Sequence, residues 1–198
     1  MAKLVLASTS PMRRQLLEAA GFRPEVVPSA VDEGACVVED PVERVAALAR
    51  AKAEAVARSY PVGEGFVVIG ADQVVFDPEV GEAWGKPPSA AVHLERLRAM
   101  RGRTHHLVTA WAVISSAGTR CGCDLTRLTL RSDLDDAELS AYVDTGEARY
   151  CAGGYAAEGH GMFLFERIDG DWSNVMGLPM GSVLTVLRDL GWRYGSRW

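Results

Sequence analysis

The chain has 198 residues, enough to bury a sizeable core in one globular unit or in one domain with a smaller lobe. With 48% hydrophobic and 24% charged residues and no low-complexity block, it belongs with ordinary globular proteins and not with disordered or fibrous ones. A formal net charge of -5 argues against a general binder of nucleic acid or of anionic membranes, because both need a broad basic surface.

The expected compartment and the state of the cysteines rest on sequence patterns for a membrane span, a signal peptide and paired cysteines. No apolar run reaches the length of a bilayer span, and Met1 to Leu6 lead into a strand-like run without a signal-peptide layout, so we expect a cytoplasmic protein. The four cysteines have no paired C-x-x-C spacing, and thiols stay reduced in the cytoplasm. We therefore expect neither a zinc site nor disulfides.

The first strand and helix indicate a place for an anion. The strand-like run Leu4 to Ala7 is followed by the turn Ser8-Thr9-Ser10-Pro11, which supplies hydroxyl groups, a helix cap and a proline suited to the first helical position. Unpaired N–H groups at that helix end would face the turn. Arg13 and Arg14 oppose the helix dipole there, and a bound anion would offset this cost. Spacing alone also fits two surface arginines on an ordinary amphipathic helix.

Two carboxylates and a lysine come next. Asp32 and Glu33 lie together on a predicted connection, where such a pair is usually solvated. The pair Asp40-Pro41 repeats the cap-then-proline pattern and begins a helix predicted to reach about Arg58. Lys52 is flanked by alanines in this helix and has room to approach a ligand, although most helical lysines face water.

The central stretch carries an acid with potential for catalysis. A β-branched apolar run from Val67 predicts a buried strand that Gly70 ends, which would place Asp72 at a strand tip. With Gln73 beside it and Lys86 a short loop away, this carboxylate could hold a metal, a water and a phosphate together. The pattern alone also fits a turn in which the acid and amide satisfy backbone groups and the lysine is solvated.

The second half of the chain predicts a helix, a hairpin and two further helices. Ser89 caps the first helix, and residues 105–115 and 120–131 indicate two antiparallel strands. Residues 132–135 resemble a capping box that starts the next helix. The last helix is expected to open at Leu178-Pro179.

A glycine-rich segment, residues 152–161, precedes a predicted strand from Met162 to Ile168. Glycine lets a backbone approach a ligand closely. Glu158 within this segment is either an exposed loop acid or a group that reads a ligand, and spacing alone favours the first.

Taken together, these motifs resemble the Maf family of nucleoside triphosphate pyrophosphatases over nearly the whole chain. The matching stretches are Leu6-Ala7-Ser8-Thr9-Ser10-Pro11 with Arg13, Asp32-Glu33, Leu48-Ala49 with Lys52-Ala53, Gly70-Ala71-Asp72, Gly85-Lys86-Pro87, Gly146-Glu147 with Ala152-Gly153, and Asn174-Val175 with Gly177-Leu178-Pro179. Many short motifs in the same order make the resemblance specific.

The resemblance implies a mixed α/β fold, with a long twisted sheet flanked by helices and a cleft between two lobes, as a single domain over residues 1–198. It implies an enzyme, often a homodimer, that uses a divalent metal (Mg or Mn) to cleave a nucleoside triphosphate into a monophosphate and pyrophosphate. By position, Asp72 is the proton acceptor and Glu33 its partner in catalysis and metal binding. The phosphate contacts carried over by position are Ser8, Ser10, Arg13, Lys52 and Lys86.

These residue types suit the chemistry. A triphosphate is highly anionic and water is a poor nucleophile, so hydrolysis needs a metal to neutralise charge, cations to clamp oxygens and a carboxylate to deprotonate water. Magnesium prefers carboxylate and phosphate oxygens and retains water molecules.

Three positions separate the branches of the family. Where the branch acting on dTTP and UTP has Arg, Thr and Gln, this chain has Met12, Gln73 and Glu158. The last two are similar to the 7-methyl-GTP pyrophosphatase branch, which commonly carries an aromatic residue where Met12 lies. A carboxylate near the base favours the positive charge of methylated guanine. We therefore expect 7-methyl-GTP or a related purine nucleotide as substrate, with a dTTP/UTP pyrophosphatase, or a non-catalytic nucleotide-binding protein of cell division, as the alternatives.

Overall fold

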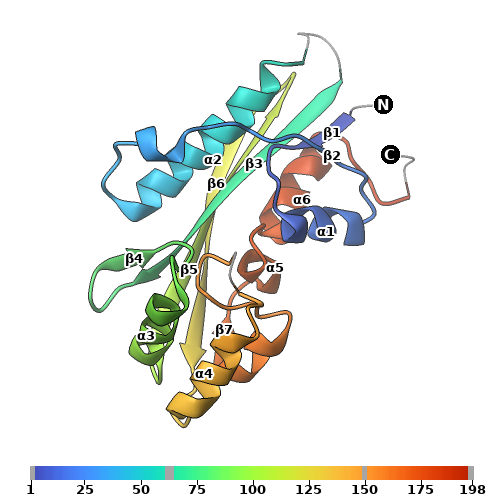
Figure 1. The fold of residues 1–198 in the computed structure, drawn as a ribbon. Helices are drawn as coiled ribbons and strands as arrows, with labels where there is room; N and C mark the ends of the chain where they lie inside the picture. The colour runs from blue at the N-terminus through green and yellow to red at the C-terminus, as the bar shows by residue number, and fades with distance from the viewer. Residues whose placement is uncertain (1–2, 61–64, 149–150, 196–198) are drawn as a thin grey trace. The chain divides into compact units, whose positions relative to one another are not determined.

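The structure, a computed structural model, describes residues 3–60, 65–148 and 151–195. Met1 and Ala2, which begin the stretch behind the expectation of a cytoplasmic protein, lie outside the described residues. The chain has a mixed α/β fold, a seven-stranded sheet flanked by helices (Figure 1). None of the helices in the described ranges has the length and apolar character needed to cross a bilayer.

The sheet mixes parallel and antiparallel pairs. Its strands are β1 (Lys3–Leu6), β2 (Glu25–Val26), β3 (Phe66–Asp77), β4 (Glu82–Trp84), β5 (Thr104–Ser115), β6 (Gly118–Leu130) and β7 (Phe165–Asp169). They follow the order β2-β1-β3-β5-β6-β7, with β4 paired to β3 outside that path. β1 is parallel to β2 and β3, whereas β4 and β7 are antiparallel to β3 and β6. A two-residue turn joins β5 to β6, which confirms the predicted hairpin.

Three of the predicted helix starts, those capped by Ser10, Asp40 and Ser89, are confirmed. The helices are α1 (Pro11–Ala19), α2 (Pro41–Ala57), α3 (Ala90–Met100), α4 (Asp136–Asp144), α5 (Trp172–Val175) and α6 (Met180–Asp189), with two 3-10 helices, η1 (Glu33–Ala35) and η2 (His160–Leu164). The side chains of Ser10, Asp40 and Ser89 accept hydrogen bonds from N–H groups in the first turns of α1, α2 and α3. Local cap chemistry therefore fixes where these helices begin.

The chain divides into two compact units. The first contains Met1–Asp72, Thr109–Asp124 and Gly177–Trp198, and the second contains Gln73–Val108 and Leu125–Met176. Each unit has its own hydrophobic core within the described ranges.

In the first unit the sheet is covered on both faces. Leu6 of β1 and Ile69 of β3 share a buried cluster with residues of α1 and α6. Their strand neighbours Val5 and Val68 share another cluster with residues of α2. Because adjacent strand residues point to opposite faces, α2 packs on one face and α1 with α6 on the other.

β3 continues through Gly70, so the prediction that this glycine ends the strand is wrong. The strand runs from Phe66 to Asp77, and Asp72 lies within it instead of at a tip. A Cβ atom at Gly70 would lie 2.5 Å from the carbonyl oxygen of Ala49 and 2.7 Å from the amide nitrogen of Ala53. The glycine therefore allows the backbone of α2 to pack directly against β3.

The capping box before α4 lies three residues later than predicted. Asp135, not Ser132, is the N-cap, and Glu138 completes the box by accepting a hydrogen bond from the Asp135 N–H. This pair satisfies two N–H groups reciprocally, which is why the helix begins at Asp136.

The strand predicted from Met162 begins instead at Phe165. Residues 160–164 form η2, where Gly161 is buried and a Cβ atom there would lie 2.4 Å from the Ala156 carbonyl oxygen. This tight approach bends the chain before the strand. The short helix α5 was not predicted, because four residues give no helical periodicity.

The second unit buries a histidine in its core. α3 and α4 pack together, and Leu97 and Leu139 join the same cluster as residues of β5 and β6. His105 is fully buried, with its Nε2 atom 2.8 Å from the hydroxyl oxygen of Tyr155. Burial lowers the pKa of His105 to about 4, although the charge of Asp77 opposes the shift.

Candidate active site

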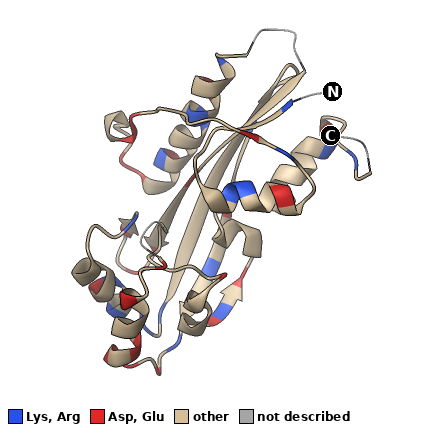
Figure 2. Cartoon of the chain, turned by 45° about the vertical axis from the view of Figure 1, so that its right-hand side comes forward, with Lys and Arg blue, Asp and Glu red and all other residues tan. Residues whose placement is uncertain are grey.

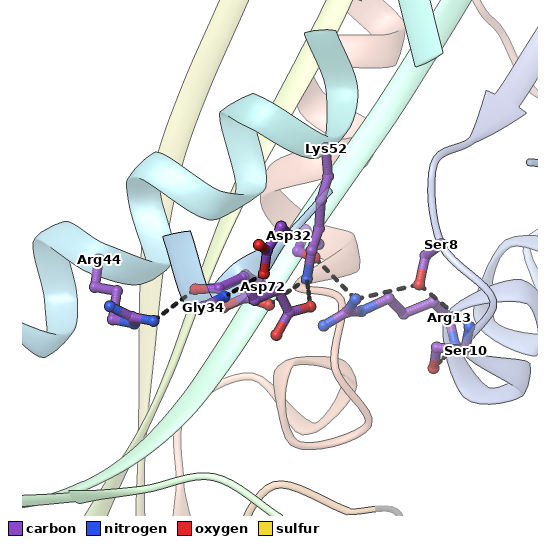
Figure 3. A network of polar contacts seen from close by, with 10 residues as sticks. Ser8, Ser10, Arg13, Asp32, Gly34, Arg44, Lys52 and Asp72 are labelled. Carbon is purple, nitrogen blue, oxygen red and sulfur yellow. Dashed lines mark hydrogen bonds and ion pairs between the residues drawn. The ribbon is translucent and has the colours of Figure 1, made fainter. Parts of the chain in front are cut away.

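A lysine lies between two carboxylates at the centre of the candidate site (Figure 3). The Lys52 Nζ atom is 2.7 Å from Glu33 Oε1 and 2.6 Å from Asp72 Oδ1. Lys52 is 8% exposed, and the exposed fractions of the Asp72 and Glu33 side chains are 15% and 59%. One buried ammonium group therefore bridges a largely enclosed carboxylate and a more open one.

Three separate elements supply these groups. Glu33 begins η1, Lys52 lies in the middle of α2 and Asp72 lies within β3. Asp72 is two residues after Gly70 and so points to the strand face on which α2 packs. The close approach of helix and strand at the glycine therefore brings the lysine to the aspartate.

Arg13 is held beside this group by main-chain carbonyls. Its Nε atom donates to the Gly177 carbonyl oxygen at 2.7 Å, and its Nη1 atom donates to the Ala71 carbonyl oxygen at 2.8 Å. Burial lowers the pKa of the Arg13 guanidinium, while the negative charges of Asp72 and Glu33 oppose that shift. The arginine thus adds a second, fixed positive charge in the same unit.

Arg14 has a different environment. Its Nε atom lies 2.7 Å from Glu18 Oε1 in an exposed pair one turn along the helix. Charged residues of both signs are interleaved in this way along several helices (Figure 2). Of the two arginines that begin α1, one is therefore a surface residue and the other faces the candidate site.

The two serines of the first turn shape the backbone between β1 and α1. Ser8 Oγ accepts hydrogen bonds from the Ser10 N–H and from Arg13 Nη1, at 3.2 and 3.3 Å. Ser10 Oγ accepts from the Arg13 N–H at 3.4 Å as the helix cap. A hydroxyl that accepts in this way still has its hydrogen to donate to an anion. Met12 is half-buried in the same helical turn.

The structure brings together six of the residues predicted for the site, all in the first unit: Ser8, Ser10, Arg13, Glu33, Lys52 and Asp72. Lys86, Gln73 and Glu158 belong to the second unit. Gln73 Nε2 donates to the Asn174 carbonyl oxygen at 2.8 Å.

Lys86 and Glu158 act electrostatically on the same thiol. Burial raises the pKa of Cys151 to about 11, the charge of Glu158 adds to that shift, and the charge of Lys86 opposes it. Lys86 is exposed, whereas Glu158 is half-buried. These two predicted residues therefore share one neighbourhood within the second unit.

Sequence reasoning missed Arg44. This residue of α2, labelled in Figure 3, donates to the main-chain carbonyl oxygens of two other residues. They are those of Glu33, at 2.7 Å, and of Cys36. Every residue type has a main-chain carbonyl, so these bonds leave no pattern in the sequence at the two residues that accept them. One sequence clue existed, because Arg44 is a cation near a helix N-terminus, the same mildly unfavourable placement that drew attention to Arg13.

The two carboxylates fit a hard divalent cation. Both lie within hydrogen-bond distance of one cationic atom, and Mg²⁺ is typically held by one or two carboxylates together with water and substrate phosphates. Within the described ranges, no cluster of three or more His, Cys, Asp or Glu side chains could hold a metal. A cation held by Glu33 and Asp72 would therefore take its remaining ligands from water or substrate.

The fold and the site define an α/β protein in which one lysine lies between two carboxylates, and a fixed arginine lies beside them with a serine hydroxyl at its guanidinium. The chain belongs to the Maf-like protein family, whose profile matches residues 3–190. The family resemblance of the sequence motifs is thereby confirmed.

Known proteins agree with this assignment. The chain is 39% identical over 196 residues to the nucleoside triphosphate pyrophosphatase of Synechocystis sp., covering 98% of this chain and 97% of that protein. It is 37% identical over 192 residues to the dTTP/UTP pyrophosphatase of Geobacillus sp., covering 97% and 100%. A solved nucleoside-triphosphatase (dITP/XTP pyrophosphatase) from Mycobacterium abscessus is 14% identical with a TM-score of 0.43, over 95% of this chain and 97% of that one, and at this distance says nothing about function.

Proposed function

We propose that the protein is a metal-dependent pyrophosphatase that hydrolyses a nucleoside triphosphate to a monophosphate and pyrophosphate. The observation that carries the proposal is the Lys52 ammonium between Glu33 and Asp72, with Arg13 fixed beside them. The names of the two family relatives support the same reaction class.

In the proposed reaction, Asp72 orients a water molecule and accepts its proton. As the water oxygen bonds to the α-phosphorus, the bond from that phosphorus to the oxygen bridging the α and β phosphates breaks, and pyrophosphate leaves with the bonding electrons. Lys52 and Arg13 stabilise the negative charge of the phosphate oxygens. Ser8 and Ser10 donate hydrogen bonds to the same tail. A divalent metal (Mg or Mn) held by Glu33 and Asp72 would supply further neutralisation of phosphate charge.

The products test this proposal directly. Purified protein, supplied with Mg²⁺ and a nucleoside triphosphate, should release monophosphate and pyrophosphate in equal amounts, measured by anion-exchange chromatography. Chelation of the metal with EDTA should abolish turnover, and added Mg²⁺ or Mn²⁺ should restore it. Orthophosphate as the sole inorganic product would contradict the proposal.

For the substrate, we propose 7-methyl-GTP or a related modified purine nucleotide. The support is the pair Gln73 and Glu158, because a carboxylate near the base attracts the positive charge of methylated guanine. Met12 would add a polarizable contact where an aromatic residue would stack. Pyrimidine triphosphates are the second candidate, supported by the name of the Geobacillus relative.

A panel of 7-methyl-GTP, GTP, dTTP and UTP separates the two candidates by kcat/KM. We expect 7-methyl-GTP to lead, and Glu158→Gln to reduce its advantage over GTP by about tenfold, since one charge contact contributes on the order of 1.4 kcal/mol. Glu166→Gln, at an exposed position of β7, is the matched control. A clear preference for dTTP and UTP would overturn the substrate proposal and leave the reaction intact. The family resemblance also leads us to propose a homodimer, which light scattering can measure.

A further inference from the structure

We propose that Arg44 is a positioning residue that fixes Glu33 for metal and triphosphate binding, an inference that rests on the proposed function. Arg44 uses its two terminal nitrogens on two carbonyl oxygens, Nη2 on Glu33 at 2.7 Å and Nη1 on Cys36. These acceptors stand at the first residue of η1 and just after its last residue, so the guanidinium spans the whole turn.

Apolar packing contributes little to this turn. None of the three residues of η1 is buried, and Val37, just beyond, is 90% exposed. Within the turn, Asp32 Oδ1 accepts from the Gly34 N–H at 3.0 Å. Hydrogen bonds, and not apolar packing, therefore keep the main chain of Glu33 in place, and Arg44 supplies two that join this main chain to α2, in addition to the contact of Lys52 with the Glu33 carboxylate.

The position of Arg44 on its helix supports a role of this kind. A cation near the N-terminus of α2 opposes the helix dipole, so its placement needs a compensating interaction. The planar guanidinium meets two carbonyls in a fixed fork, which a lysine ammonium does not reproduce. Arg44 is half-buried, unlike Arg50 further along the same helix.

Two residues of α2 therefore hold Glu33, one through its main chain and one through its carboxylate. Arg44 holds the main chain of Glu33, and Lys52, two turns later on the same helix, contacts its carboxylate at 2.7 Å. Without the guanidinium the turn has more conformations, and the Glu33 carboxylate spends less time beside Asp72. Metal affinity should then fall even though no residue that touches the metal has changed.

The test compares Arg44→Met and Arg44→Lys with Arg50→Met. The control removes an exposed arginine from the same helix, whose Nε atom pairs only locally with Glu54 Oε1 at 2.7 Å. Mn²⁺ binding is measured by electron paramagnetic resonance without nucleotide, and hydrogen exchange is followed over residues 31–40. We expect both Arg44 variants to weaken Mn²⁺ binding about tenfold and to speed exchange in that segment, with wild-type behaviour in Arg50→Met. Saturating Mn²⁺ should restore most of kcat in Arg44→Met, because Asp72 is untouched.

Four results would overturn the inference: unchanged Mn²⁺ affinity in Arg44→Met, faster exchange without weaker binding, equal losses in Arg50→Met, or full recovery in Arg44→Lys, which would show that charge alone matters. Failure of the proposed function gives a different pattern. Wild-type protein would then turn over no triphosphate, while the Arg44 variants would still bind Mn²⁺ more weakly than wild type.

Discussion

Lys52 is nearly enclosed, and its ammonium is the positive charge that lies between Glu33 and Asp72. Removing one member of a buried ion pair leaves the other charge uncompensated, which is much more costly than breaking a pair at the surface. The pair formed by Lys3 and Glu25 is such a surface case, with side chains 60% and 41% exposed. Removal of the lysine ammonium should therefore cost more stability at Lys52 than at Lys3.

Lys52→Met should change metal and substrate binding in opposite directions. Two carboxylates without their ammonium attract a divalent cation more strongly, so Mn²⁺ affinity without nucleotide should rise by about tenfold. The triphosphate loses a cation, so kcat/KM should fall by about 100-fold or more. Resonance titration and steady-state kinetics measure the two effects. Lys3→Met serves as the control, and a fall in Mn²⁺ affinity in Lys52→Met would contradict the assignment.

At the scale of elements, the contact between α2 and β3 decides whether the site forms. Gly70 lets the helix backbone at Ala49 and Ala53 approach the strand, and Lys52 lies directly before Ala53. Any group larger than hydrogen at the glycine must push the helix outward. Lys52 would then move away from Asp72, so that packing and function depend on the same contact.

Gly70→Ala should therefore destabilise the protein and impair turnover together. The added methyl group overpacks the interface, for which we expect a loss of about 1–3 kcal/mol in the free energy of unfolding. Urea denaturation measures this loss, and kcat/KM should fall with it. Gly85→Ala, where the new Cβ meets nothing within 4 Å, should leave stability almost unchanged. Equal stability of the two variants would show that α2 moves away from β3 without a cost in free energy.

The helix starts and the contact between α2 and β3 show what the sequence can and cannot predict. The starts of α1 and α2 were predictable because a capping side chain and a proline act within a few residues of each other. The role of Gly70 was not, because a glycine within a strand pattern indicates a bulge or a close backbone approach without saying which element approaches, and here that element is a helix outside the strand. The acids and cations of the site were predicted from family motifs. Their contacts, such as Lys52 to Asp72 across 20 residues, and the main-chain role of Arg44, depend on the folded backbone.

At the scale of the whole molecule, we expect stability against acid to depend on a histidine that has no part in the proposed chemistry. His105 is fully buried in the core of the second unit and faces Tyr155 and Asp77. Its pKa is lowered to about 4, against 6.5 for a free histidine. Between these values the unfolded chain binds more protons than the folded one, so the free energy of unfolding falls as the pH drops.

From this difference we expect His105 to cost about 2 kcal/mol of stability between pH 7 and pH 5. From about pH 8 the residue is neutral in both states and contributes almost no slope. Urea denaturation at the two pH values measures the effect. The slope should shrink in His105→Gln and persist in His160→Gln, an exposed position. An undiminished slope in His105→Gln would assign the acid sensitivity to other groups.

The most direct measurement of the central claim compares wild type with Asp72→Asn in the presence of Mg²⁺, following pyrophosphate release under single-turnover conditions. The amide keeps the size of the side chain but is a far weaker base and metal ligand, so the rate should fall by at least about 1,000-fold while the protein still folds, with Lys52 paired to Glu33. Asp144→Asn, an exposed change on α4, should behave like wild type. A rate close to that of wild type in Asp72→Asn would remove Asp72 from the mechanism and contradict the account.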